Sequence, residues 1–248
     1  MRISAFITVR SASNRLPNKC FLPFGNVTVL EHMIIRSRHY GFDPIICTTN
    51  EKEDDRIEYI AIDNNVNVYR GPKANKLQRW RDCCRYFNID AFHSVDADDP
   101  FFCGDEVRRS FSLLGQNYDM VSPSPSSSGG GATVGYSITS NIIEKACRGL
   151  NKDTDTEMMW SYIEKIDGLK SIALSDPLLF VIKNRMTLDY HEDYILLEAI
   201  RLMIGGLATR EQVFNVIKNN PDIVNINAFR SEEWAQGQKD KLFKQEGA

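Results

Sequence analysis

The stretch I-S-A-F-I-T-V-R-S-A-S-N-R-L-P-N-K, residues 3–19, decides how the rest of the chain is interpreted. Its beginning, residues 3–9, is mostly apolar and predicts a buried strand. Five polar side chains then share one loop: the cations Arg10, Arg15 and Lys19 and the hydroxyls of Ser11 and Ser13. Open α/β sheets bind ligands at the carboxyl ends of their strands. We therefore predict that this loop binds a polyanion, for which a triphosphate is the obvious candidate.

Strand and helix patterns alternate through the first half of the chain. Apolar residues at helical spacing follow the loop and stop at Gly41, a typical helix end. The same criteria predict strands over 44–49, 66–69 and 91–95 and helices over 53–62 and 77–87. This order predicts an α/β fold, a three-layer αβα sandwich with a mainly parallel sheet.

The second half is less regular. Strands are predicted over 120–122, 133–139 and 176–183, and helices over 141–149, 154–166, 191–204 and 209–219. Thr154 and Glu157 have the spacing of a capping box, which favours a helix start there. Residues 229–248 are polar, and we expect them to form a C-terminal tail that docks around Trp234.

The low-complexity stretch P-S-P-S-S-S-G-G-G opens directly after the strand at 120–122. Such a composition usually marks a flexible linker between domains. We favour a flexible Ser/Gly loop over 122–131, a lid or substrate-side loop, because residues 1–121 lack the closing elements of a full fold. Long unstructured loops in compact domains tend to be functional. We therefore expect one domain over residues 1–248.

The bulk composition indicates a cytoplasmic enzyme with small-molecule partners. The chain has 248 residues, 30 basic and 33 acidic, with a net charge of -3. This balance argues against general nucleic-acid or membrane-surface binding. No apolar run approaches the length of a membrane span, and no signal-peptide core is evident. The six cysteines include no C-x-x-C pair, so structural zinc is not expected and a reducing compartment suits them.

The basic loop resembles the R-x-x-S-x-R-L-P-x-K signature of the cytidylyltransferases that activate Kdo and sialic acids. It is most similar to that of the spore-coat polysaccharide cytidylyltransferases. The matching positions are Arg10, Ser13, Arg15, Leu16, Pro17 and Lys19. The resemblance implies a nucleotide-diphospho-sugar transferase-like (Rossmann-like) fold and a homodimer. It also implies transfer of CMP from CTP to a sugar acid or other small acceptor in surface polysaccharide or glycoconjugate biosynthesis.

A second cluster, D-A-D-D-P over residues 96–100, follows the strand predicted at 91–95. Carboxylates this crowded repel one another unless a cation lies among them. Mg²⁺ takes one or two protein carboxylates and completes its shell with water and phosphate oxygens. The segment resembles the A-D-x-P element of the family, which implies Asp98 as a magnesium ligand with Asp96 and Asp99 as neighbours. Considered alone, it is equally an acidic turn that caps the next helix.

A third cluster, R-M-T-L-D-Y-H-E-D over residues 185–193, resembles the family's R-x-T-x-D-x-x-x-D segment. The resemblance implies that Asp189 completes the metal site. Arg185 and Asp193 are expected on the acceptor side, with Asp193 orienting the segment or capping the helix that begins here.

Weaker matches extend the resemblance. Arg70 and Gly71 with Leu77 resemble the R-G-x-x-x-D-V-L-x-R stretch near the nucleotide, although Asn75 stands at the aspartate. Glu157 resembles a glutamate of the acceptor side. Residues 129–135 depart from the acceptor-side pattern of the family, so the acceptor is left open.

The resemblance and the charges together assign roles to the site residues. Catalytic roles are expected for Arg10, Lys19 and Asp98, and metal binding for Asp98 and Asp189. Nucleotide binding is expected from Val9, Arg10, Ser11, Ser13, Arg15, Lys19, Arg70, Gly71 and Asp96. Positioning and charge neutralisation would then provide most of the catalysis.

Two alternatives remain at this point. Residues 96–98 spell D-x-D, the element with which glycosyltransferases of the same fold hold a metal against a sugar donor. A nucleotide-binding family member that has lost catalysis is the other alternative, because Asn75 and residues 129–135 depart from the pattern.

Overall fold

The computed structural model describes residues 1–176 and 184–246, and its centre is a seven-stranded sheet. The strand order is β5-β4-β1-β6-β8-β7-β9. The pairs β5–β4, β4–β1, β1–β6 and β7–β9 are parallel, whereas β8 runs antiparallel to β6 and β7. The strands are β1 (Ile3–Thr8), β4 (Pro44–Thr49), β5 (Asn67–Gly71), β6 (Ala91–Asp96), β7 (Met120–Ser122), β8 (Ser137–Thr139) and β9 (Ser171–Ala173). A separate hairpin pairs β2 (Pro23–Phe24) with β3 (Val27–Thr28).

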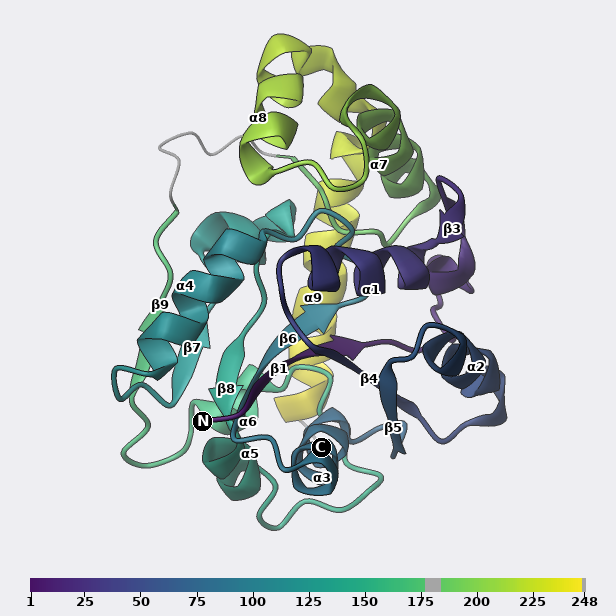
Figure 1. Cartoon of the computed structure of the whole chain (residues 1–248). Coiled ribbons are helices and arrows are strands. Elements are labelled where there is room, and N and C mark those ends of the chain that lie inside the picture. The colour runs from purple at the N-terminus through teal and green to yellow at the C-terminus, as the bar shows by residue number, and fades with distance from the viewer. Residues whose placement is uncertain (177–183, 247–248) are drawn as a thin grey trace.

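Helices cover both faces of the sheet, as Figure 1 shows. The helices are α1 (Val29–His39), α2 (Asp55–Asp63), α3 (Lys76–Phe87), α4 (Gly104–Leu114), α5 (Ser140–Ala146), α6 (Trp160–Ile163), α7 (His191–Ile204), α8 (Arg210–Asn219) and α9 (Ser231–Glu246). Short 3-10 helices lie at η1 (Lys19–Phe21), η2 (Lys52–Asp54), η4 (Pro221–Ile226) and η5 (Ala228–Arg230), and a π turn at η3 (Ser127–Gly131). None of the helices within the described ranges has the length and apolarity needed to cross a bilayer.

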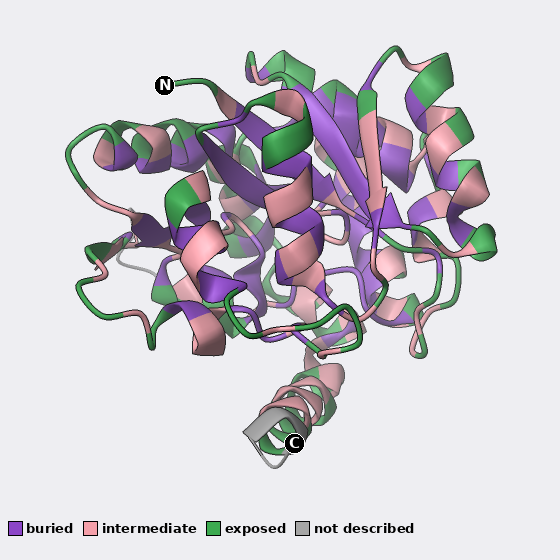
Figure 2. Ribbon diagram, turned by 90° about the horizontal axis from the view of Figure 1, so that it is seen from below, coloured by how far each residue is buried: buried purple, intermediate pink, exposed green. Residues whose placement is uncertain are grey.

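Alternation along β1 divides the core into two apolar clusters. Ala5 and Ile7 pack with residues of α1, α2 and α4, whereas Phe6 between them packs with α3 and α5. Successive side chains of a strand point to opposite faces, so one strand supports both layers. The central strands β1, β4 and β6 are the most deeply buried part of the sheet, which Figure 2 shows in purple. The expected three-layer sandwich with a mainly parallel sheet is confirmed.

The second half differs from its predicted elements. The helix expected over 154–166 is wrong: α6 covers only Trp160–Ile163. The Thr154 hydroxyl accepts a bond from the Asn151 amide (3.2 Å) and closes a turn there instead of capping a helix. The strand β9 was not predicted. The strand expected over 176–183 lies, apart from its first residue, outside the described residues.

Residues 127–131 of the Ser/Gly stretch, within the segment 122–131 for which we expect a flexible loop, form a compact π turn. The Ser127 hydroxyl accepts bonds from the Thr133 and Val134 amides at 3.0 and 2.9 Å and donates to the Val134 carbonyl oxygen at 2.8 Å. These bonds satisfy the backbone from within, so part of the turn is buried despite its composition.

The expected polar tail contains a helix, α9. None of its side chains over 231–243 is buried, and Figure 2 shows the helix standing apart from the body of the molecule. Its attachments are side-chain contacts at the candidate site, described below.

Candidate functional site

The loop that leaves β1 is anchored to the neighbouring strand end. Ser11 donates through its amide (2.7 Å) and its hydroxyl (2.6 Å) to Asp54 Oδ1, and the Val9 amide donates to the Cys47 carbonyl oxygen (3.2 Å). Burial alone disfavours ionised Asp54, but bonds from Ser11 and the Thr49 hydroxyl lower the pKa of that carboxyl. Ser11 therefore anchors the loop through Asp54, whereas a direct contact with nucleotide was expected from the sequence.

The tip of the loop holds its shape through local contacts. The Ser13 hydroxyl accepts a bond from the Leu16 amide at 3.4 Å. Asn18 has a φ of 58°, in the left-handed region that glycine and asparagine adopt most readily. The turn directs Lys19 toward the ends of the strands.

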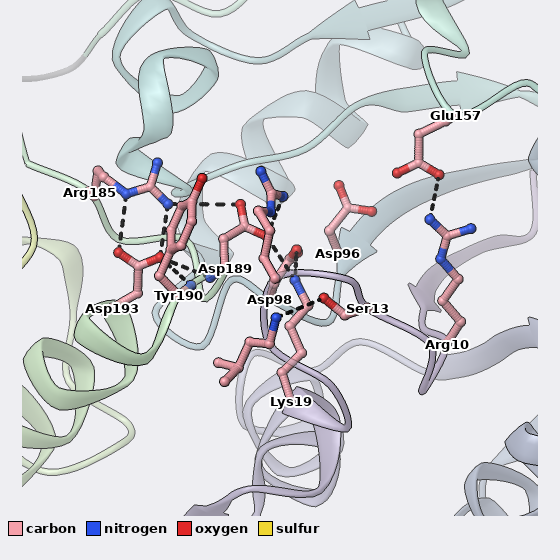
Figure 3. A network of polar contacts seen from close by, with 12 residues as sticks. Arg10, Ser13, Lys19, Asp96, Asp98, Glu157, Arg185, Asp189, Tyr190 and Asp193 are labelled. Carbon is pink, nitrogen blue, oxygen red and sulfur yellow. Dashed lines mark hydrogen bonds and ion pairs between the residues drawn. The ribbon is translucent and has the colours of Figure 1, made fainter. Parts of the chain in front are cut away.

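Lys19 joins the second and third sequence clusters, as Figure 3 shows. Its Nζ lies 2.7 Å from Asp98 Oδ2 and 3.0 Å from Asp189 Oδ1. Arg15 also reaches Asp189, at 2.7 Å. Burial alone disfavours the ammonium, but the two carboxylates more than offset this and raise the pKa of Lys19 above its usual range. Segments that are distant in the sequence thus meet at one charged centre.

The carboxylates after β6 form a cluster suited to a divalent cation. Asp96, Asp98 and Asp99 each offer an oxygen within 4.8 Å of the others. Burial and the negative charges of Asp98 and Asp96 raise the pKa of Asp99 well above its ordinary value. Several carboxylate oxygens this close together suit Mg²⁺ or a similar hard cation, which prefers oxygen ligands. The donor set therefore fits the expected metal.

Arg185 and Asp193 form a buried pair that contacts Asp189 and holds it in position. Arg185 donates to both carboxylate oxygens of Asp193, at 3.1 and 2.9 Å, and the two side chains are 2% and 0% exposed. Asp193 Oδ2 also accepts the amides of Asp189 and Tyr190 at 2.9 Å each, at the start of α7. We assign this buried pair a positioning role, because neither side chain is accessible; this is the role in orienting the segment and capping the helix that the sequence analysis gave Asp193, whereas Arg185 was expected on the acceptor side.

Glu157 lies at the opposite end of the site from Arg185 and Asp193 (Figure 3). Its two oxygens face Arg10 (3.2 Å) and Lys241 of α9 (3.6 Å). Although partial burial favours the neutral acid, nearby cations, chiefly Lys76, Arg10 and Lys241, lower the pKa of Glu157 to about 2. Glu157 is thus a fixed negative charge beside the basic loop, and the three residues expected on the acceptor side do not lie together.

Arg70 and Gly71 shape the edge of the site at β5. Arg70 donates to the carbonyl oxygens of Thr49 (2.9 Å) and Glu51 (2.7 Å) and pairs with two acids of α2. These contacts use its guanidinium to hold the connection between β4 and α2, so Arg70 supports this edge and does not join the carboxylate cluster. A Cβ on Gly71 would lie 3.1 Å from the Arg79 side chain, which explains the glycine.

Two residues of the site, Lys76 and Lys241, were missed by the sequence analysis. Lys76 Nζ lies 3.3 Å from Asp96 Oδ1 and 4.8 Å from the centre of the Trp80 ring. The spacing of Lys76 and Trp80, one helical turn apart, was a usable signal. Trp234, around which we expected the tail to dock, lies against Arg185. Lys241 of α9 reaches Glu157, and nothing in its polar surroundings indicated that contact.

Comparisons with known proteins show the family of this chain and its fold. The family model described as cytidylyltransferase matches residues 4–129, about half of the chain. A solved cytidylyltransferase from Leptospira borgpetersenii is 26% identical, covers 90% of this chain and 97% of its own, and superposes with a TM-score of 0.81. Spore coat polysaccharide biosynthesis protein SpsF of Bacillus subtilis is 24% identical over 230 residues, 87% of this chain and 94% of that protein.

A more distant structure shows the same fold. CMP:2-keto-3-deoxy-manno-octonic acid synthetase, solved with CTP, covers 82% of this chain and 99% of its own with a TM-score of 0.62. At 11% identity this likeness concerns the fold alone, that of the nucleotide-diphospho-sugar transferases. The matched family model covers the basic loop and the D-A-D-D-P segment, and the chain belongs to the cytidylyltransferase family of CTP-dependent nucleotidyltransferases.

Proposed function

We propose that this protein transfers CMP from CTP to a small acceptor with the help of Mg²⁺ and releases pyrophosphate. The observation that carries the proposal is the position of Lys19 between Asp98 and Asp189. This position supports a reaction site at which the cations of the loop would bind the phosphates of CTP next to carboxylates that bind the metal. The printed role of SpsF in spore coat polysaccharide biosynthesis supports a place in surface polysaccharide or glycoconjugate synthesis.

The cations of the loop would bind the triphosphate by exchanging partners. Arg10 now pairs with Glu157, Arg15 with Asp189, and Lys19 with Asp98 and Asp189. Phosphate oxygens are multivalent acceptors, so a triphosphate can replace several carboxylates at once. Charge-assisted hydrogen bonds of this kind are roughly twice as strong as neutral ones.

We assign the metal to Asp98, which forms a metal-compatible group with Asp96 and Asp99, and to Asp189, which shares the Lys19 ammonium with Asp98. When bound there, the metal would neutralise phosphate charge and polarise the phosphoryl group. Asp193 accepts a hydrogen bond from the backbone amide of Asp189 at 2.9 Å, and Arg185 holds the Asp193 carboxylate. The pair thereby keeps Asp189 in place. The protein thus contributes a fixed arrangement of charges, which costs no reorganisation during the reaction.

The chemical step is an in-line displacement at the α-phosphorus. An acceptor oxygen forms the new bond to phosphorus while the bond to the bridging oxygen of the β-phosphate breaks, and pyrophosphate leaves with that electron pair. The cations Arg10, Arg15 and Lys19 would stabilise the negative charge that the leaving group gains. Positioning and charge neutralisation account for most of the rate in reactions of this class.

Thermal unfolding with nucleotides tests the proposal. CTP at one hundred times its dissociation constant should stabilise the fold by about 2.7 kcal/mol, a rise in Tm of about 5–10 °C, and Mg²⁺ should enhance the effect. ATP, GTP and UTP are the base controls. A response to nucleotide-sugars alone would favour the D-x-D glycosyltransferase, and no response to any nucleotide would refute the triphosphate site.

Two further expectations belong to the same proposal. We infer a homodimer, which light scattering of the purified protein will test. A cytoplasmic location is the other, and fractionation of cells that express the protein will test it.

A further inference from the structure

Two polar side chains of α1, His32 and Arg36, are buried outside the carboxylate cluster and contact backbone oxygens. They stand four positions apart, so they lie on the same face of the helix. His32 is 4% exposed and Arg36 is 0% exposed. Burying a charge costs free energy unless the group is paired or hydrogen-bonded. The proposed reaction uses neither residue, so their contacts need another explanation.

Both side chains hold the turn that follows Asp98. His32 Nε2 donates to the Pro100 carbonyl oxygen at 2.8 Å. A carbonyl oxygen can only accept, so this ring nitrogen carries the proton. Arg36 Nε donates to the Phe102 carbonyl oxygen at 2.9 Å. Because these acceptors lie two and four positions after Asp98, the face of α1 fixes the backbone of the segment that carries this carboxylate.

The same arginine also reaches the connection between α7 and α8. Arg36 Nη1 donates to the Gly206 carbonyl oxygen and Nη2 to the Ala208 carbonyl oxygen, each at 3.0 Å. A Cβ on Gly206 would lie 3.0 Å from His32 Cε1, so this connection packs closely on His32 as well. The helix α7 begins two positions after Asp189. One guanidinium therefore joins the turn after β6 to the helix that follows Asp189, and Figure 1 shows α1 between the strands and the pair of α7 and α8.

The two carboxylate-bearing segments also meet directly. The Leu188 amide donates to the Asp98 carbonyl oxygen at 2.7 Å. The segments of Asp98 and Asp189 are thus connected once at the site and once through Arg36. Mg²⁺ demands near-ideal octahedral geometry. An ion that takes oxygens from both carboxylates therefore needs both segments held at a set separation.

Packing alone does not account for a charged residue at position 36. Within residues 1–176 and 184–246 no carboxylate pairs with Arg36, and burial lowers the pKa of its guanidinium. The rings of Tyr40, Phe101 and Phe102 lie 5.3, 5.7 and 5.3 Å from its central carbon. A methionine would fill this space without taking a charge out of water. What the guanidinium adds is a planar fork of donors, which here meets three carbonyl oxygens.

We propose that His32 and Arg36 position the carboxylates that bind the metal, by holding the turn after β6 against the connection between α7 and α8. Both residues act through the backbone. This inference rests on the proposed function, because it concerns the Mg²⁺ that the reaction uses. Replacing residues that orient metal ligands typically weakens metal binding about 10- to 100-fold. We expect the lower end, about 10-fold, because the contacts lie two or more positions from the ligand.

Thermal unfolding of the full chain with CTP and increasing Mg²⁺ tests the role of His32. The measured quantity is the Mg²⁺ concentration that gives half of the metal-dependent rise in Tm. Mg²⁺ and CTP associate equally in solution whichever variant is present, so differences in this concentration come from the protein. His32→Phe keeps a ring but removes the donor, and should raise the half-maximal concentration about 10-fold. His32→Gln keeps an N–H donor, and should return it to within about 2-fold of the unchanged protein.

Arg36→Met tests the second residue, and Arg38→Met is its control. Arg36→Met removes the three donors and should raise the half-maximal Mg²⁺ concentration at least about 10-fold. Its Tm without ligand is recorded first, because three carbonyl oxygens lose a partner. Arg38→Met removes an exposed cation of the same helix and should match the unchanged protein. The rise in Tm that CTP causes without Mg²⁺ should be the same in every variant, because the basic loop is unaltered. Should Arg36→Met fail to fold, the two variants of His32 decide the question.

A purely structural role predicts a different result. The variants would then unfold at a lower temperature without ligand, but the half-maximal Mg²⁺ concentration would be equal in all of them. That outcome overturns this inference and leaves the proposed function standing. An equal rise in His32→Phe and His32→Gln also overturns it, because the hydrogen bond to Pro100 would then not be responsible. If Mg²⁺ does not enhance the CTP effect even in the unchanged protein, the metal of the proposed function is refuted, and this inference with it.

Discussion

Replacing Lys19 with methionine removes one charge from the centre of the site and keeps most of the length of the side chain. The lysine Nζ lies 2.7 Å from Asp98 and 3.0 Å from Asp189, and its side chain is 16% exposed. The two carboxylates raise the pKa of Lys19 against the opposing effect of burial, so the lysine is charged at neutral pH. In Lys19→Met, two carboxylates lose a shared counterion.

The expected loss of stability follows from these contacts. Removing one partner of a buried ion pair costs about 3–5 kcal/mol. The lower figure applies here, because Arg15 at 2.7 Å and Arg185 at 3.8 Å still face Asp189. A loss of about 3 kcal/mol corresponds to a fall in Tm of about 6–12 °C for a chain of this length. Turnover should fall by at least about 100-fold.

Urea unfolding and pyrophosphate release measure the two effects. Mg²⁺ without nucleotide should restore more stability to Lys19→Met than to the unchanged protein, because the variant leaves the carboxylates without the ammonium. Lys165→Met, which removes an exposed lysine, is the matched control. The reasoning is refuted if Lys19→Met unfolds within about 0.5 kcal/mol of the control, the usual range for surface changes, or keeps near-full turnover.

Three further predictions concern a metal ligand, a buried base and the last helix. In Asp98→Asn, Mg²⁺ should no longer increase the rise in Tm that CTP causes, and pyrophosphate release should fall at least about 100-fold. The control Asp105→Asn, at an exposed carboxylate, should change neither. If Mg²⁺ increases the rise in Tm of Asp98→Asn as much as that of the unchanged protein, Asp98 is not a metal ligand. Burial lowers the pKa of His93 from 6.5 to about 3. Between pH 6.5 and pH 3 only the unfolded chain protonates this imidazole, so the free energy of unfolding decreases as the pH is lowered. The free energy of unfolding should fall by about 2 kcal/mol between pH 6.5 and pH 5, and urea unfolding of His93→Gln should show a smaller fall. If the unfolding free energies of the variant and the unchanged protein depend on pH equally, the lowered pKa of His93 is contradicted. A chain that ends at residue 230 should unfold within about 1 kcal/mol of the full chain, because no described side chain of α9 is buried, and a loss above about 3 kcal/mol in thermal unfolding would disprove this.

The first half of the fold could be predicted because its strands are long and buried. The strand predicted over 44–49 coincides with β4, in which every residue is buried, and such runs have an unambiguous pattern. The three-residue strand β9 is too short to show a period and was missed, whereas the strands predicted over 120–122 and 133–139 contain β7 and β8. The Thr154 and Glu157 spacing misled because the same residues satisfy a turn equally well. The local sequence pattern therefore does not distinguish the start of a helix from an isolated turn.

The three charged segments of the site could also be predicted, but their pairing could not. The sequence indicates cations and carboxylates at strand ends; it does not indicate that Lys19 lies between Asp98 and Asp189. The role of α9 was hidden for a different reason. A helix with no buried described side chain lacks an apolar stripe, which is the main sequence signal for a helix that packs.

The contacts of Lys19 also bear on how the protein folds. They join residues 79 and 170 positions apart in the chain, so the intervening segments must be in place before the site exists. Closing loops of that length is slow, because the entropy of closure is lost before the contact forms. A nascent or refolding chain can therefore complete β1, β4 and β5 without gaining any competence for catalysis. Recovery of activity should lag behind recovery of the sheet, which makes activity a reporter of the last stage of folding.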